Sequence, residues 1–203
     1  MMSAHDERQM RFCTDDGTEL VGDLSVPTSC AAAAVVCHPH PQFGGNRFNP
    51  VVDAVHRSLP EVGVASLRFD FRERFGERLD AEAALVELRR AVPDVPVVAI
   101  GYSFGAMVAM SVHVEDLAAR ILIAPPLGRS AGEPNRICPT LVLTPAHDQF
   151  APPEVAGPIV EAWPDAEFQV IDIADHFLAG RTSTVADRVA AWVSDRWPPR
   201  SLP

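Results

Sequence analysis

Residues 97–107 read Val-Val-Ala-Ile-Gly-Tyr-Ser-Phe-Gly-Ala-Met, a continuous apolar run that ends in the pattern Gly-x-Ser-x-Gly. The run lacks the alternation of a half-exposed strand, so it predicts a strand buried on both faces of a sheet. Residues 104–112, directly after Ser103, have the composition and spacing of a helix. The stretch therefore predicts a buried strand, a one-residue turn at Ser103 and a helix.

This strand–turn–helix context is the one in which Gly-x-Ser-x-Gly carries chemistry. Ser103 is expected at the turn in a strained backbone conformation, with its Oγ above the edge of the sheet. Gly101 and Gly105 suit the motif because a Cβ at either position would collide where strand and helix converge. The N-terminus of the helix would direct N–H groups toward negative charge beside Ser103. We interpret Ser103 as a nucleophile; the alternative is a tight turn in any parallel-sheet fold.

The length of 203 residues predicts one domain, residues 1–203, with a sizeable core. The 47% hydrophobic and 22% charged residues are those of an ordinary globular protein. The net charge of −10 argues against partners such as nucleic acid or anionic membrane surfaces. No apolar run approaches the roughly 20 residues of a membrane span. The polar start lacks the hydrophobic segment of a signal peptide, and the four cysteines show neither CxxC nor zinc spacing. We therefore expect a cytoplasmic protein.

Strands alternate with helices along the rest of the chain, which indicates an α/β fold with a mostly parallel sheet covered by helices on both faces. The first two strands flank the turn signal Asp15-Asp16-Gly17 and should form an antiparallel hairpin. Besides the run before Ser103, the predicted strands are residues 9–14, 19–26, 31–37, 64–71, 120–124, 140–144 and 167–173. The predicted helices are residues 51–59, 80–91, 104–112, 154–163 and 183–197. In such sheets functional residues gather at the carboxyl ends of the strands.

Two of these strand ends carry the residue types that a serine nucleophile needs. The strand 140–144 leads into Asp148, and the last strand leads into His176. A serine hydroxyl is a poor nucleophile until an imidazole takes its proton, and a carboxylate must hold that imidazole in the right tautomer. Ser103, Asp148 and His176 occur in the order nucleophile, acid, base that this fold type uses, so we predict them as catalytic residues. Asp175 is a rival acid, but its side chain adjoins His176 and is poorly placed to point at it.

Residues 38–46 form a Pro- and Gly-rich loop, His-Pro-His-Pro-Gln-Phe-Gly-Gly-Asn, after a strand that should neighbour the strand before Ser103. Acyl transfer needs two N–H donors for the oxyanion; one should be Phe104, and the other should come from this loop. The two prolines have no N–H. The remaining candidates are His40, Gln42 and Phe43. We favour His40, two residues beyond the end of the strand.

An alternative interpretation of His38-Pro39-His40 is a pair of metal ligands. No further His or carboxylate follows at the spacing of a metallohydrolase. We therefore expect that the two histidines shape the loop and that no metal is bound.

Taken together, these motifs resemble the alpha/beta-hydrolase superfamily. More narrowly, the chain is similar to a compact bacterial group with a His-Pro-His-Pro…Gly-Gly loop, a Gly-Tyr-Ser-Phe-Gly elbow and an Ala-Asp-His-Phe histidine motif. The resemblance extends from about Thr18 to Val193. It implies an eight-stranded, mostly parallel sheet with a Ser-His-Asp triad, and it does not supply a substrate.

The chain departs from these relatives at residues 72–78, which read Arg-Glu-Arg-Phe-Gly-Glu-Arg where the group has a small neutral loop. Arginines at the edge that carries Ser103 suit recognition of an anionic group on the substrate, because a guanidinium donates two parallel hydrogen bonds. We name Arg72, Arg74 and the elbow residue Tyr102 as candidate substrate-binding residues. The alternative is a solvated face, because two glutamates are interleaved and exposed pairs contribute only about 0–1 kcal/mol.

Residues 125–139 lie where larger relatives place a lid, and they are too few to form a helical cap. We therefore expect a single-domain alpha/beta-hydrolase fold without a lid domain, and a shallow site that favours small acyl groups. The predicted function is hydrolysis of carboxylic esters of small soluble substrates through an acyl-enzyme at Ser103, with no cofactor. Alternatives are a thioesterase, peptidase, acyltransferase, carbon–carbon hydrolase or cofactor-free peroxidase of the same fold, or a non-catalytic ligand-binding module.

Overall fold

The computed structural model describes residues 5–73, 75–128, 134 and 137–199. Its sheet has eight strands in the order β1-β2-β4-β3-β5-β6-β7-β8. The strands are β1 His5–Cys13, β2 Glu19–Pro27, β3 Ala32–Cys37, β4 Val64–Phe69, β5 Val97–Tyr102, β6 Leu117–Ile123, β7 Thr140–His147 and β8 Ala166–Asp175. The helices are α1 Pro50–Ser58, α2 Glu77–Ala91, α3 Phe104–Ser111, α4 Pro153–Glu161 and α5 Thr182–Arg196, with two short 3-10 turns, η1 Pro41–Phe43 and η2 Pro60–Val62.

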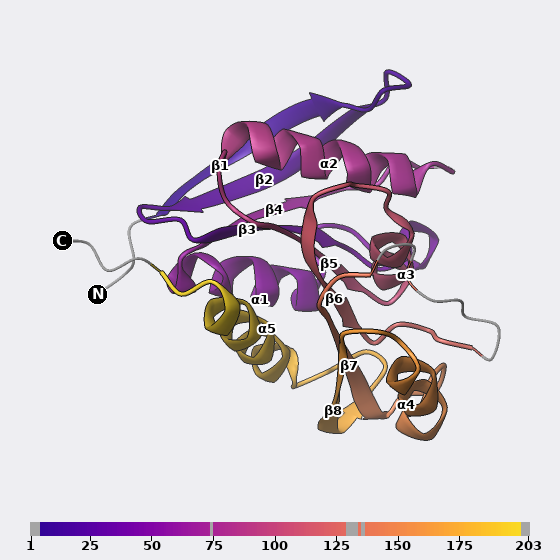
Figure 1. Cartoon of the computed structure of the whole chain (residues 1–203). Helices are drawn as coiled ribbons and strands as arrows, with labels where there is room; N and C mark the ends of the chain where they lie inside the picture. Colours follow the sequence, from indigo (N-terminus) through magenta and orange to yellow (C-terminus); the bar gives the residue numbers. More distant parts are fainter. Residues whose placement is uncertain (1–4, 74, 129–133, 135–136, 200–203) are drawn as a thin grey trace.

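The sheet is antiparallel only at one edge, where β1 pairs with β2 and β2 pairs with β4. All other neighbours are parallel. Helices cover both faces: α1 and α5 lie on one face and α2, α3 and α4 on the other (Figure 1). The predicted doubly covered, mostly parallel sheet with an opening hairpin is therefore confirmed.

The three central strands β3, β4 and β5 are buried along their whole length. Successive side chains of a strand point to opposite faces, so Val35 packs in the core under α2 and α3, while Val36 packs in the core under α1 and α5. This is why β3 and β5 read as unbroken apolar runs, whereas β4 also contains the buried polar residues Ser66 and Arg68. The carboxyl ends of β3 and β5 lie side by side, because the two strands pair directly.

Several element ends differ from the expected ones. β1 begins at His5 and β6 at Leu117, both earlier than expected, and β8 continues to Asp175. β4 ends at Phe69, two residues earlier than expected, although the backbone N–H of Asp70 still donates to Val21 of β2 at 3.0 Å. α2 begins at Glu77, earlier than expected, after Gly76 with φ of 122°, a backbone conformation that a glycine adopts without strain. β7 extends to His147 through a register shift against β8.

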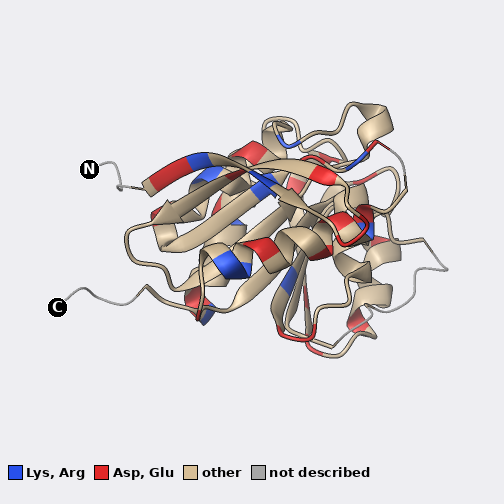
Figure 2. Ribbon diagram, turned by 90° about the horizontal axis from the view of Figure 1, so that it is seen from above, with Lys and Arg blue, Asp and Glu red and all other residues tan. Residues whose placement is uncertain are grey.

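No helix forms between β6 and β7 in the described residues 125–128, 134 and 137–139. Within the described part of the chain, no helix is long and apolar enough to cross a membrane. Acidic residues outnumber basic ones along the ribbon, in keeping with the net charge of −10 (Figure 2).

Candidate active site

Ser103 stands at the junction of β5 and α3 with φ of 54° and ψ of −115°, a strained conformation for a residue with a side chain. The junction is tight because a Cβ on Gly101 would lie 2.1 Å from the carbonyl oxygen of Gly105. A Cβ on Gly105 would lie 2.3 Å from the carbonyl oxygen of Cys37, at the end of β3. The predicted reason for both glycines, close approach of backbone to backbone, is therefore confirmed.

The structure brings Ser103, His176 and Asp148 together from the ends of three strands. Ser103 Oγ lies 2.8 Å from His176 Nε2, and His176 Nδ1 lies 2.9 Å from Asp148 Oδ2. His176 and Asp148 are buried, and Ser103 is half-buried. With its Nδ1 facing a carboxylate, the imidazole carries its proton on Nδ1, which leaves Nε2 free to accept the proton of Ser103.

Asp148 is held in place by its own turn. Its Oδ1 accepts the backbone N–H groups of Phe150 at 2.8 Å and Ala151 at 3.1 Å, so Oδ2 remains for His176. The rival acid, Asp175, accepts the backbone N–H of Phe177 at 3.0 Å. The carboxylate that faces the imidazole in the structure is therefore that of Asp148.

Three further contacts fix His176. The sequence did not predict that the residues making these contacts support the histidine. Tyr102 Oη donates to the carbonyl oxygen of His176 at 2.9 Å, and the backbone N–H of His176 donates to Gln149 Oε1 at 3.3 Å. The ring of Phe150 packs edge-on against the imidazole, with 4.5 Å between centroids. Tyr102 is buried and its hydroxyl is bonded to the His176 backbone, so these contacts give it a role in supporting His176. The position of Gln149 and Phe150 directly after Asp148 was the only sequence signal for them.

The second candidate oxyanion donor belongs to residues 38–46, here called the His40 loop. Two of the three candidate N–H groups are engaged inside the loop: Gln42 N donates to His40 Nδ1 at 3.2 Å, and Phe43 N donates to the carbonyl oxygen of His40 at 3.0 Å. The ring of His40 packs on that of Phe104 with centroids 4.5 Å apart. The backbone N–H of His40 is the remaining candidate, because these bonds engage the other two. The prediction that the loop supplies the second oxyanion donor therefore rests on His40.

His38 at the root of the loop is buried, and both of its ring nitrogens have partners. Nε2 accepts the backbone N–H of Phe71 at 3.0 Å, so the proton is on Nδ1, which donates to the carbonyl oxygen of Pro39 at 2.6 Å. Burial lowers the pKa of His38 below its ordinary value. These contacts agree with a loop-shaping role. In the described residues, no group of three or more His, Cys, Asp or Glu side chains is placed to hold a metal ion.

Arg72 does not face an open site in the structure. Its side chain is 13% exposed; Nε donates to the fully buried Asp80 at 2.7 Å, and Nη1 donates to Asp16 at 2.7 Å. The guanidinium holds the pKa of Asp16 well below its usual range. Arg72 thus joins the β1–β2 turn to α2. The solvated-face interpretation fits Arg78, which pairs with Glu82 one helical turn away, and the remaining candidate, Arg74, lies outside the described residues.

A cavity of about 460 Å³ opens beside the His40 loop. Its lining is part loop and part residues 73–77: His40, Pro41, Gln42, Glu73, Phe75 and Glu77. Phe75 is 91% exposed. Apart from His40, the ionisable groups in this described lining are the carboxylates of Glu73 and Glu77. Anion binding by the arginines of this segment stays a prediction.

An eight-stranded, mostly parallel sheet with a serine at a sharp turn after a central strand is the architecture of the alpha/beta hydrolases as a class. The chain belongs to the alpha/beta hydrolase family, because a model of that family matches residues 34–203. A protein of Rickettsia prowazekii, described as uncharacterised, is 34% identical over 110 residues, which are 48% of this chain and 46% of that protein. The chain thus matches less than half the length of this curated relative.

Solved structures agree with this assignment. An alpha-beta serine hydrolase homologue from Coxiella burnetii is 25% identical, with a TM-score of 0.83 over 92% of this chain and 97% of that one. A Xanthomonas campestris protein, described as a serine hydrolase without a lid, is 24% identical, with a TM-score of 0.85 over 97% of both chains. The esterase domain of a Rhodothermus marinus protein is 24% identical, with a TM-score of 0.74 over 95% of this chain and 99% of that one.

Proposed function

We propose that this protein is a serine hydrolase that cleaves carboxylic esters of small substrates through an acyl-enzyme at Ser103. The observation that carries the proposal is the hydrogen-bonded series from Ser103 Oγ through His176 to Asp148 at a strained turn. Such a series is the arrangement that activates a serine hydroxyl.

In the first half of the reaction, Ser103 Oγ attacks the carbonyl carbon of the ester while its proton passes to His176 Nε2. The carbonyl oxygen becomes an oxyanion that accepts hydrogen bonds from the backbone N–H groups of Phe104 and His40. The intermediate collapses, the bond to the alcohol oxygen breaks, and His176 gives its proton to the leaving alcohol. Asp148 keeps the imidazole oriented and stabilises its charged form.

In the second half, a water molecule attacks the acyl carbon while His176 takes one of its protons. The second tetrahedral intermediate uses the same two N–H donors. Its collapse breaks the bond to Ser103 Oγ, which recovers the proton from His176, and the carboxylic acid leaves.

Two observations support ester hydrolysis of small substrates. A structurally similar chain is an esterase domain, and another is a serine hydrolase without a lid. The described residues between β6 and β7 form no helix that would cover Ser103, which suits an open site.

The four cysteines are free thiols, which supports the cytoplasm as the compartment.

Labelling with a fluorophosphonate tests the proposal, because only an activated serine reacts. We expect one label per chain, located on Ser103 and absent from Ser103→Ala, and turnover of nitrophenyl acetate or butyrate. A protein that takes no label and cleaves no ester would be a binding module instead. Faster turnover of a matched thioester, amide or carbon–carbon substrate than of the oxygen ester would assign the site to one of the other reactions of this fold.

A further inference from the structure

We propose that the ion pair of Arg47 and Asp70 positions the His40 loop, and that it acts on the reaction through the backbone N–H of His40. The inference deepens the proposed function and rests on it. We assign both residues a positioning role, without contact to the substrate. Sequence reasoning named neither of them.

The His40 loop is folded tightly on itself. The carbonyl oxygen of His40 accepts two backbone N–H groups, from Phe43 at 3.0 Å and from Gly45 at 3.1 Å. A Cβ on Gly45 would lie 1.9 Å from the carbonyl oxygen of Pro39, so the backbone at the start of the loop touches the backbone near its end. A loop bound in this way moves as a unit. The direction of the His40 N–H is therefore decided where the loop joins the rest of the protein.

The first end of the loop is fixed at His38. Its buried ring accepts the backbone N–H of Phe71, just beyond β4, at 3.0 Å. Its carbonyl oxygen lies 2.6 Å from the point that a Cβ on Gly105 would occupy, so the start of α3 touches the His38 backbone directly. This end is consequently tied both to the exit of β4 and to the turn that carries Ser103.

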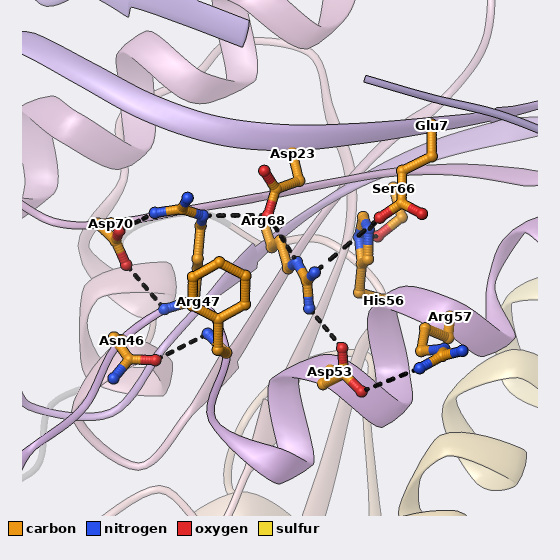
Figure 3. Close-up of polar contacts among 11 residues, drawn as sticks. Glu7, Asp23, Asn46, Arg47, Asp53, His56, Arg57, Ser66, Arg68 and Asp70 are labelled. Atoms are coloured by element: carbon orange, nitrogen blue, oxygen red, sulfur yellow. Dashed lines mark hydrogen bonds and ion pairs between the residues drawn. The ribbon is translucent and has the colours of Figure 1, made fainter. Parts of the chain in front are cut away.

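The second end is fixed by Arg47, the first residue after the loop. Its backbone N–H donates to Asp70 Oδ1 at 2.8 Å, and its guanidinium donates to Asp70 Oδ2 (Figure 3). Asp70 directly precedes Phe71, so two consecutive residues hold both ends of the loop. The side chain of Asp70 and the backbone N–H of Phe71 thus bind the loop directly after β4, while the backbone N–H of Asp70 still donates to the carbonyl oxygen of Val21 in β2 at 3.0 Å.

The pair is part of a larger network, in which the side chain of Asp70 is 38% exposed. Arg47 has a side chain that is 11% exposed, and its Nε donates to Asp23 Oδ2 at 3.0 Å. Arg68 donates to the same oxygen at 3.2 Å and to Asp53 at 2.6 Å (Figure 3). The ring of Phe48 lies 4.3 Å from the Arg47 guanidinium and 5.0 Å from that of Arg68. Buried ion pairs add little stability over apolar packing. What a planar guanidinium supplies here is direction, because its donors fix the angle at which the chain leaves the loop.

The experiment compares Arg47→Ala and Asp70→Asn with Asp53→Asn. Asp53 is the matched control, since it bonds to Arg68 in the same network but lies on α1 and holds no part of the loop. For nitrophenyl acetate, kcat should fall about 10- to 100-fold in Arg47→Ala, and KM should change less than about twofold, because a displaced oxyanion donor weakens the transition state and not substrate binding. Asp53→Asn should keep kcat within about twofold.

A second readout separates positioning from loss of stability. A methyl trifluoromethyl ketone forms an adduct in which Ser103 Oγ bonds to the carbonyl carbon, the hydroxyl proton moves to His176, and the oxygen becomes an oxyanion. Its affinity should fall in Arg47→Ala by the same factor as kcat, because the adduct resembles the transition state. In the double variant with Asp70→Asn, the loss should be smaller than the product of the two single losses, since the residues act as a pair.

The inference is overturned if kcat and ketone affinity of Arg47→Ala lie within about twofold of the wild-type values. It is also overturned if these two quantities differ by less than about twofold between Arg47→Ala and Asp53→Asn. If Arg47→Ala does not fold, Arg47→Lys keeps the charge without the planar fork and should lose part of kcat; a lysine variant at wild-type kcat overturns the inference as well. An inert wild-type protein overturns the proposed function and this inference together, whereas an active one with insensitive variants overturns the inference alone.

Discussion

The two sides of Ser103 are built in different ways. On the side of β7 and β8, Asp148 and His176 reach the hydroxyl through direct bonds between side chains. On the side of β3 and β4, the candidate oxyanion donor is a backbone N–H, and its position depends on His38 and Arg47 at the ends of a loop. We call these the acid–base side and the loop side.

The difference teaches where each side is vulnerable. On the acid–base side the identity of a few side chains decides the chemistry, so their removal should stop the reaction and leave the fold intact. On the loop side no side chain takes part in the reaction; residues remote from the substrate decide where the backbone lies. Substitutions there should give graded losses that are coupled to stability.

The largest expected effect lies on the acid–base side. Ser103→Ala and His176→Ala should each lower kcat for a nitrophenyl ester by about 10⁴–10⁶-fold, because the three residues act as a unit. Asp148→Asn should lower it heavily but less, since the amide still accepts the two N–H groups of its turn. Steady-state kinetics, with urea unfolding as the check on the fold, measure this. A Ser103→Ala variant that keeps near-full activity would end the serine-hydrolase proposal.

Arg72 on the loop side should matter for stability and not for substrate choice. Arg72→Ala leaves the buried Asp80 without its guanidinium partner, and we expect a loss of about 3 kcal/mol in the free energy of unfolding. The ratio of kcat/KM between a carboxylate-bearing ester and a neutral ester of equal size should stay unchanged. The control is Arg78→Ala, which removes an exposed pair and should cost less than about 1 kcal/mol. A selective rise in KM for the anionic ester in Arg72→Ala would restore the anion-binding hypothesis.

Gly105 joins the two sides and gives a smaller effect. In Gly105→Ala the new Cβ meets the carbonyl oxygens of Cys37 and His38, and we expect a loss of about 1–3 kcal/mol in stability because backbone must shift. Gly157 is the matched helical control: its added Cβ would lie 3.6 Å from the Phe168 ring. Gly157→Ala should be neutral or stabilise by about 0.5–1 kcal/mol. Equal unfolding midpoints for the two alanine variants would show that the strand–helix contact is looser than described.

The smallest effect concerns the cavity on the loop side. Glu73 and Glu77 line it, so an ester that carries a trimethylammonium group should have a KM about two- to fivefold lower than its neutral tert-butyl analogue. This difference in KM should shrink as the salt concentration rises. Glu73→Gln combined with Glu77→Gln should remove the preference, whereas Glu61→Gln, an exposed residue at the other end of β4, should keep it. A preference for the carboxylate analogue would point to a cation near the cavity.

The sequence was sufficient to predict the sheet and the acid–base side. Strands buried on both faces leave apolar runs, and Ser103 and Asp148 follow two of them, β5 and β7. His176 follows β8, an edge strand that is partly exposed, so its proximity was predicted from the order of nucleophile, acid and base along the chain. The contacts of Gln149 and Phe150 with His176 were not predicted, because neither side chain is a nucleophile, acid or base and both act only by supporting His176.

The loop side was less predictable because its contacts join residues far apart in the chain. Arg72 was interpreted from its neighbours Glu73 and Glu77, yet its partners are Asp16 and Asp80. Which carboxylate an arginine meets depends on how the strands pair. The periodicity of one strand contains no such information.

The buried ring of His38 gives the loop side a sensitivity to acid. Its Nε2 accepts an N–H only while the imidazole is neutral, and burial lowers its pKa from the ordinary 6.5. The unfolded chain therefore binds a proton near pH 6.5 that the folded chain refuses, so stability is complete above this pH and is lost as the pH falls below it. Unfolding in urea from pH 8 to pH 5 should show a steeper decline for wild type than for His38→Gln. Mild acid would then loosen the root of the His40 loop, and it would act also on His56 of α1, whose buried ring contacts Ser66 of β4 and whose pKa is lowered by burial to about 4.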